Sequence, residues 1–447
     1  MIKNYLLLLL ILILLVNSTF AEKTNKEYDN PAILSFETIA LNISRDGKSS
    51  LSISRDHFKH LKKSLKWSWN APNAQWEIKQ NVGYIPLKKK SDAFVSTFVF
   101  WVYSEKPLKN EKLKVEFLKE NQVKCYFDYN LDFSGWRGAW IAFNRDMQGT
   151  PVEGMDEVRF TAPDTPEGTL YFDHMMLSSM QDVRQHTADF QAPFINKNTE
   201  NHWLILLRSW NKDFDIPLNS SFSISEKEGT EIISNRLRNL LLEGKKIKSV
   251  EDLRKSFDQY QISLNQDGSV KGLPVFFERY GETYEYLGAE RYNKIFDNPM
   301  GLSSAVKTLF DLAVSYNLST DEKEKKQFSE MFILLTKHLL DQGFQAGSGM
   351  GTLHHLGYSM RDYYPAMFLM AKPLKENKLD KTIQQSMEWF AGTGEVKTDT
   401  KDVEMDIDAF NTSLIGRLTS ILMIDDVASK IRYLHAFSRW VDKGFKY

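Results

Sequence analysis

Residues 347–370 read GSGMGTLHHLGYSMRDYYPAMFLM and join two segments that have helical periodicity. The first segment ends in LLTKHLLDQGF (334–344), and the second begins in the apolar run 364–370. Four glycines, at positions 347, 349, 351 and 357, loosen the chain between them. The stretch therefore predicts a helical region with a polar segment between two helices, a common place for functional groups on a rigid scaffold.

This polar segment supplies the candidate site residues. The adjacent His354 and His355 are candidate catalytic groups, because a histidine titrates near neutral pH and can act as a base. Tyr358 and Tyr364 are candidates for substrate binding by stacking against a sugar ring. Arg361 joins them because its guanidinium fork matches a sulfate or a carboxylate. The alternatives are packing or surface roles for the histidines and an ion-pairing or capping role for Arg361.

Residues 22–183 have a β pattern. Runs such as LSISR, SLKWSWN, AFVSTFVFWVY and KLKVEFL alternate apolar and polar residues and are separated by turn residues. This spacing predicts an antiparallel, jelly-roll-like β-sandwich. Six of the ten tryptophans lie between residues 67 and 140, and Trp67 and Trp69 share one face. Core packing explains this pair, and a platform for stacking glycans is the alternative.

A structural calcium site is one further hypothesis for the β region. Glu37 lies near the first strand and Asp173 near the last, so the two carboxylates could meet across the sheet. Calcium prefers oxygen ligands, and Ser35 together with backbone carbonyls near His60 would complete the shell. No ligand spacing in the sequence proves this site.

Beyond a predicted linker at 184–225, residues 226–447 have helical periodicity. Predicted helices follow near 249–261, 300–317, 322–342, 359–372, 376–392, 405–424 and 426–442. Their short connections predict antiparallel helical hairpins. The segment 268–280 is predicted to be extended, with Phe276, Phe277 and Tyr280 forming either a cleft wall or a core plug. Asn411 lies at a helix start, where it either binds substrate or caps the helix.

The N-terminus reads MIKNYLLLLLILILLVNSTFA, which predicts a signal peptide at 1–21 and a secreted or periplasmic protein. Its apolar run of about eleven residues is too short to span a bilayer comfortably, so we expect no membrane contact after cleavage. The formal net charge of -1 gives no bias toward nucleic acid. The single cysteine, Cys125, excludes an internal disulfide and a cysteine-cluster metal site.

Several motifs resemble the chondroitin sulfate ABC lyases, relatives of the hyaluronate and chondroitin AC lyases. They are SLKWSW, FVFWVYSEKPL, LDFSGWRGAWIAFNRDM, DEVRFTAP, LYFDHMMLS, LLTKHLLDQGF, LHHLGYSMRDYY and DAFNTS. The resemblance runs from about residue 28 to the C-terminus. It implies a carbohydrate-module-like β-sandwich followed by an incomplete α/α toroid.

The resemblance also implies a reaction. The family cleaves sulfated glycosaminoglycans, here chondroitin or dermatan sulfate, by β-elimination at a uronic acid after abstraction of the C5 proton. His354 and His355 look like the family's paired histidines, one of which would be the iduronate-side base or would neutralise the carboxylate. The chemistry requires no metal or redox cofactor.

One departure from the family pattern concerns the main catalytic pair. In the family another catalytic histidine is followed seven residues later by a catalytic tyrosine, whereas none of the nine histidines here has a tyrosine at that spacing. We therefore expect the chain to be the N-terminal, truncated portion of a lyase, inactive alone and completed by a downstream lyase chain. The alternatives are a non-catalytic protein that binds sulfated glycans, and a remnant without function that aggregates through exposed apolar faces.

Overall fold

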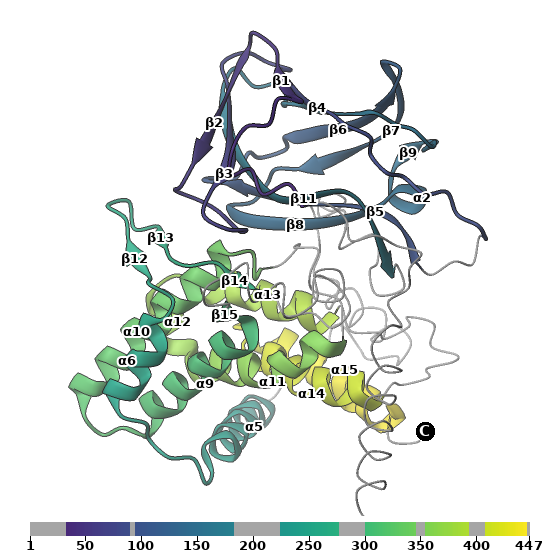
Figure 1. Cartoon of the computed structure of the whole chain (residues 1–447). Helices are drawn as coiled ribbons and strands as arrows, with labels where there is room; N and C mark the ends of the chain where they lie inside the picture. Colours follow the sequence, from purple (N-terminus) through teal and green to yellow (C-terminus); the bar gives the residue numbers. More distant parts are fainter. Residues whose placement is uncertain are drawn as a thin grey trace, which may run out of the picture.

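The computed structural model describes residues 33–89, 94–182, 224–276, 300–345, 354–392 and 407–444. A β-sandwich is followed along the chain by a helical region, and the two lie side by side (Figure 1). The predicted signal peptide and nearly all of the predicted linker fall outside the described residues. Among the described helices none combines the length and the apolar character needed to cross a bilayer.

The β-sandwich consists of two antiparallel sheets. The six-stranded sheet has the order β1 (Ile43–Arg45), β4 (Gln75–Lys79), β10 (Glu157–Thr161), β6 (Lys112–Lys119), β7 (Gln122–Asn130) and β9 (Gln148–Gly149). The five-stranded sheet has the order β2 (Ser49–Ser54), β3 (Ser64–Trp69), β11 (Gly168–Asp182), β5 (Phe94–Ser104) and β8 (Gly135–Ala142). A short helix, α2 (Phe143–Asp146), follows β8. The predicted antiparallel sheets are thus present.

Strand β5 shows why the five-stranded sheet is buried on both faces. Phe98 and Phe100 belong to the core between the two sheets, whereas Val99, Trp101 and Tyr103 belong to a second core shared with the helices. Successive side chains of a strand point to opposite faces, so this near-continuous apolar run fills both cores. The outer face of the sheet is therefore the surface on which the helical region packs.

Trp67 and Trp69 lie in the core between the sheets. Their exposed fractions are 0% and 3%, and their rings are 5.1 Å apart. Trp76 packs beside them and stacks on Phe160 with ring centroids 4.1 Å apart. The prediction that core packing explains the tryptophan pair is confirmed, and the alternative of a glycan-stacking platform at these two residues is wrong, because no face of either ring is open.

The helical region contains nine described helices. They are α5 (Ile224–Leu242), α6 (Val250–Asp258), α9 (Leu302–Leu318), α10 (Glu322–Asp341), α11 (His354–Leu369), α12 (Ala371–Glu376), α13 (Asp380–Gly392), α14 (Ile407–Leu422) and α15 (Val427–Gly444). Helix α11 packs between α9 and α14, and α10 packs on α9 after a three-residue connection. Asp321 caps α10 by accepting hydrogen bonds from the backbone N–H groups of Lys323 and Glu324.

Short strands connect the helical region to the sandwich. They form the antiparallel pair β12 (Ser263–Leu264) and β13 (Val270–Lys271), and the parallel pair β14 (Val275–Phe276) and β15 (Met300–Gly301). The described part of the predicted extended segment 268–280 includes β13 and β14. The side chains of Phe276, Phe277 and Tyr280 lie outside those described, so the choice between cleft wall and core plug stays open.

Helix α11 begins at His354, five residues before the predicted start at 359. Gly357 has low helix propensity, so the local pattern predicts that the helix begins after it. Contacts with α9 and α14 outweigh that local preference. The histidine pair therefore occupies the first turn of the helix rather than the loop before it.

Candidate functional site

The predicted catalytic pair stands at the N-terminus of α11. His354 and His355 are its first two residues. A helix start presents unsatisfied N–H groups and a partial positive charge, both of which favour an anionic group nearby. The side chains of these histidines, of Tyr358 and of Asn411 are outside the described set, so their roles stay predictions.

The first turns of α11 have an exposed and a buried side. Arg361 is exposed, and by helical spacing positions 354 and 358 fall on the same side of the helix as position 361. Tyr363 and Tyr364 are each 1% exposed. Burial raises the pKa of Tyr363 above its ordinary value, so its hydroxyl stays protonated. The chemistry-bearing positions thus lie opposite the packing positions.

Tyr364 lies in the packed contact between α11 and α14. A Cβ placed on Gly416 of α14 would lie 2.1 Å from Cε2 of Tyr364, so the ring occupies the space that the glycine leaves. This placement argues against the predicted contact of Tyr364 with substrate. The sequence could not show it, because a tyrosine that packs a helix interface and one that stacks on a sugar look alike.

The end of α10 lies directly against the sandwich. Gly343 has a φ of 97°, and a Cβ there would lie 2.6 Å from the carbonyl oxygen of Trp136 and 2.8 Å from the ring of Trp101. Gln345 Nε2 donates to the carbonyl oxygen of Ser134 at 2.8 Å. Only a residue without a side chain fits this contact.

Lys59, in the loop between β2 and β3, is the buried centre of the contact between the sandwich and the helices. Its Nζ donates to the carbonyl oxygens of Val275 (3.1 Å) and Gln342 (2.9 Å) and to Oε1 of Gln342 (3.2 Å). The ammonium also lies 4.5 Å from the ring centroid of Trp101. Three acceptors match the three N–H donors of a charged lysine. Burial lowers the pKa of Lys59 to about 7, and Asp341 opposes that shift.

Among the acidic groups, Asp341 has the largest effect on the pKa of Lys59. Tyr103 donates its hydroxyl to Oδ1 of Asp341 at 3.1 Å. Burial raises the pKa of Asp341 to about 6, while the tyrosine hydrogen bond and Lys59 lower it. His57 stacks on the other side, with ring centroids 3.8 Å from Tyr103, and burial lowers its pKa to about 4. Neither Lys59 nor Asp341 is predicted as a site residue, because nothing in the sequence pattern marks a lysine or its acidic partner as buried.

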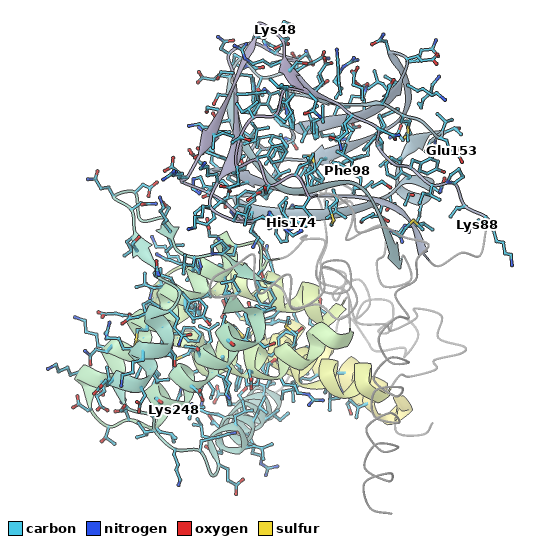
Figure 2. All side chains as sticks on the ribbon, viewed as in Figure 1. Lys48, Lys88, Phe98, Glu153, His174 and Lys248 are labelled. Carbon is cyan, nitrogen blue, oxygen red and sulfur yellow. The ribbon has the colours of Figure 1, made fainter. Side chains whose placement is uncertain are left out.

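Asp173 is held by backbone N–H groups. Its Oδ2 accepts from the N–H groups of Lys59 (2.6 Å) and His60 (2.7 Å), and its Oδ1 accepts from that of His174 (2.7 Å). Burial raises the pKa of Asp173 well above its ordinary value, and the three N–H donors oppose the rise. His174 lies on the side of the sandwich that faces the helices (Figure 2). The loop at 59–60 is thereby fixed to β11.

This arrangement does not fit a calcium ion bound by Asp173. The backbone groups of His60 that face the carboxylate are N–H donors, not the predicted carbonyls. Glu37 accepts from the N–H of Lys62 at 2.9 Å, and Ser35 is half-buried. Over the described ranges no three His, Cys, Asp or Glu side chains group as metal ligands would. The predicted site awaits a direct test.

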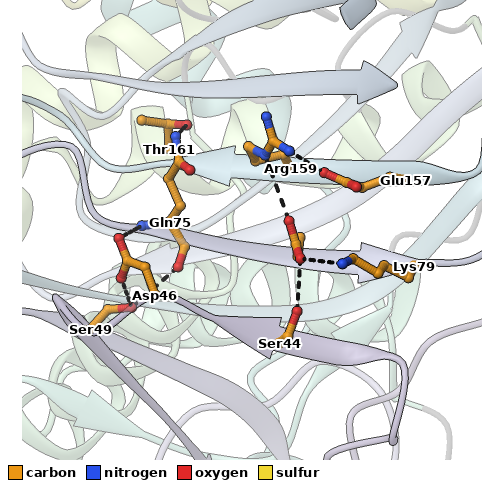
Figure 3. A network of polar contacts seen from close by, with 9 residues as sticks. Ser44, Asp46, Ser49, Gln75, Lys79, Glu157, Arg159 and Thr161 are labelled. Atoms are coloured by element: carbon orange, nitrogen blue, oxygen red, sulfur yellow. Dashed lines mark hydrogen bonds and ion pairs between the residues drawn. The ribbon is translucent and has the colours of Figure 1, made fainter. Parts of the chain in front are cut away.

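The outer face of the six-stranded sheet carries a polar network (Figure 3). Arg159 pairs with Glu157 (2.5 Å) and lies 3.7 Å from Glu77. Glu77 also accepts from Ser44 (2.9 Å) and pairs with Lys79 (3.1 Å). The Arg159–Glu77 pair joins β10 to β4 and the Ser44–Glu77 hydrogen bond joins β1 to β4, whereas the other two pairs lie within one strand. Such polar contacts are typical of a stable solvated sheet face.

Two family models and several curated proteins match this chain. The family model "Lyase, N terminal" matches residues 30–194, and "Lyase, catalytic" matches residues 216–447. A chondroitin sulfate ABC exolyase from Bacteroides thetaiotaomicron is 38% identical over 89% of this chain and 39% of its own length. An exolyase of the same name from Proteus vulgaris is 29% identical over 90% of this chain and 41% of its own length.

Among solved structures, a family 11 carbohydrate-binding module from Clostridium thermocellum matches 33% of this chain and 93% of its own, at 15% identity and a TM-score of 0.23. That similarity is too low to bear on function. The chain spans about two-fifths of the length of the two curated relatives. The lyase models cover both the sandwich and the helical region, and the second includes the histidine pair and α11. The chain therefore belongs to the chondroitin sulfate ABC lyase family of polysaccharide lyases.

Proposed function

We propose that the protein acts on chondroitin or dermatan sulfate by β-elimination at a uronic acid. The observation that carries the proposal is the histidine pair at the start of α11, within the region that matches the catalytic lyase model. Relatives named as chondroitin sulfate ABC lyases supply the substrate class.

The reaction makes clear demands on such a site. The C5 proton of a uronate is weakly acidic, so the neighbouring carboxylate must be neutralised before a base can remove the proton. The N-terminal end of α11 and the guanidinium of Arg361 are suited to an anion. A neutral histidine from the pair takes the C5 proton as the bond between C4 and its oxygen breaks, and a tyrosine returns a proton to the leaving oxygen. No metal or redox chemistry is required for this step.

The test is a cleavage assay with chondroitin sulfate and dermatan sulfate on the purified chain mixed with the C-terminal part of a relative, following the ultraviolet absorbance of the unsaturated uronate. We expect His354→Ala and His355→Ala to abolish product formation. His435→Ala is the matched control, because His435 is exposed on α15 and should leave the rate unchanged. Equal rates in all three variants would show that the pair has no catalytic role.

A second candidate is binding of a sulfated glycan without cleavage. It is favoured by the absence, anywhere in the sequence, of a histidine followed by a tyrosine seven residues later. This candidate predicts affinity for chondroitin sulfate at low salt that falls on Arg361→Ala, with no unsaturated product. Neither binding nor product at low salt would exclude both candidates.

Three finer features belong to the same proposal. The helical hairpins are part of an α/α toroid, residues 1–21 direct export, and a complementing lyase chain supplies a histidine followed by a tyrosine seven residues later. Support comes from the packing of α9, α10, α11 and α14 and from the apolar N-terminal run. Recovery of cleavage on adding the C-terminal part of a relative would support the complementing chain.

A further inference from the structure

We propose that Lys59 is a positioning residue for the candidate catalytic helix, so that the sandwich sets the placement of α11 through the end of α10. The inference rests on the proposed function, because that function makes the start of α11 the reactive end. It assigns the N-terminal domain a part in organising the site.

The first step is the double attachment that Lys59 makes. The residue belongs to the sandwich, yet its ammonium donates to β14 through Val275 and to the end of α10 through Gln342. Lys59 is 3% exposed. A buried charge is tolerated only where its donors are satisfied, so the three acceptors and the ammonium must stay together. One side chain thus fixes two segments of the helical region to the sandwich.

The second step is the role of Gln342. Its Oε1 accepts from both Lys59 Nζ (3.2 Å) and the backbone N–H of Val275 (3.2 Å). One turn earlier on α10, Nε2 of His338 lies 2.8 Å from the carbonyl oxygen of Leu273. The last turn of α10 is therefore held against the 273–275 segment at two points. Lys59 of the sandwich hydrogen-bonds to both segments.

The third step leads from Gln342 to α11. Phe344 N–H donates to the carbonyl oxygen of Leu339 (2.9 Å) and Gly343 N–H to that of Leu340 (3.1 Å), which is a Schellman end to the helix. This termination presents the buried ring of Phe344 to Tyr363 of α11, with ring centroids 4.8 Å apart. Tyr363 lies two residues after Arg361. The contacts thus run without a gap from Lys59 to the candidate catalytic helix.

The charges around Lys59 fit an anchoring role. Asp341 and His338 face it from α10, and Asp173 and His174 face it from β11. Burial lowers the pKa of His338 to about 4, so that ring is neutral near pH 7. The two carboxyl groups favour the protonated lysine, whereas burial opposes it. The Lys59 amine is therefore the hydrogen-bond donor that both domains share, and it is charged below about pH 7.

Hydrogen exchange of the full chain, resolved by mass spectrometry, tests the proposal. In Lys59→Met and in Gln342→Met we expect amides of α11 to exchange at least about tenfold faster, because the contact chain is cut at either end. Strands β6 and β7 of the far sheet should be unchanged. Lys66→Met is the matched control, since the Lys66 ammonium lies 5.5 Å from the ring centroid of Tyr171 within the sandwich itself.

A kinetic measurement separates positioning from simple stability. Well below the melting temperature, Lys59→Met should lower kcat about tenfold, with KM changed less than about threefold, because misplaced groups slow the chemical step more than they weaken binding. These rates are measured with the C-terminal part of a relative added; if the unaltered chain gives no product in that mixture, the proposed function fails and exchange alone decides the positioning role. Unchanged α11 exchange in both variants overturns the inference, as does faster exchange with unchanged kcat. If Lys59→Met does not fold, Gln342→Met decides.

Discussion

Lys59 determines how the stability of the molecule should depend on pH. Its pKa is about 7 in the folded protein, against an ordinary value of 10.5. Between these two values the unfolded chain binds a proton that the folded chain has released, so stability rises with pH. The contribution is complete above pH 10.5 and is lost as the pH falls through about 7.

The corresponding prediction compares two lysines across this window. From pH 7 to pH 10 the urea midpoint of the unaltered chain should rise relative to that of Lys59→Met, while Lys66→Met should follow the unaltered chain. If the urea midpoints of Lys59→Met and of the unaltered chain change equally with pH, Lys59 keeps an ordinary pKa in the folded state.

Asp173 provides a second prediction at the scale of single residues. Three backbone N–H groups point at its two oxygens. In Asp173→Asn an NH2 group replaces one of the two carboxylate oxygens. Whichever oxygen it replaces, it faces at least one backbone N–H, and that buried N–H is left without an acceptor. We expect a loss of about 1–3 kcal/mol in the free energy of unfolding by urea. Asp164→Asn, at an exposed position, should cost almost nothing.

The same variant tests the calcium hypothesis. A structural calcium ion would raise the melting temperature of the unaltered chain, and a chelator would lower it. The N–H groups around Asp173 lead us to expect no change on adding either one. A calcium-dependent rise that disappears in Asp173→Asn would restore the predicted site.

At the scale of elements, Gly343 shows how closely α10 meets the sandwich. Gly343→Ala would combine an unfavourable φ of 97° with contacts of 2.6 Å and 2.8 Å to Trp136 and Trp101. Gly244 is the matched control, because its φ is 68° and a Cβ there has nothing within 4 Å. Equilibrium unfolding should show a loss of about 1–2 kcal/mol for Gly244→Ala and about 2–4 kcal/mol for Gly343→Ala. Equal losses would mean that the interface adjusts to the extra methyl group.

The elements themselves were largely predictable from the sequence. Alternation in AFVSTFVFWVY and the helical period of 322–342 depend on local patterns, and β5 and α10 follow them closely. The start of α11 at His354 was not predicted, because packing on α9 and α14 overrides the low propensity of Gly357. The burial of Tyr364 and Lys59 also depends on distant segments, which a local pattern does not contain.

At the scale of the whole molecule, the two domains share one hydrophobic core. Trp101, Tyr103 and Trp136 from the sandwich lie in the same cluster as Leu309, Leu335 and other residues of the helices. Removing the helices would expose this apolar sheet face to water. The sandwich and the helices should therefore stabilise each other, although they match separate family models.

The shared core predicts one cooperative unfolding transition for the chain. Tryptophan fluorescence reports mainly on the sandwich, where six of the ten tryptophans lie between residues 67 and 140, and far-ultraviolet circular dichroism reports mainly on the helices. The two signals should give the same urea midpoint, because neither domain can lose its partner without exposing the face around Trp101. Lys59→Met should separate the midpoints, since it cuts the buried link to α10 and β14, whereas Lys66→Met should keep them together. Two midpoints in the unaltered chain would show that each domain is stable alone, and the sandwich could then not hold α11 in place.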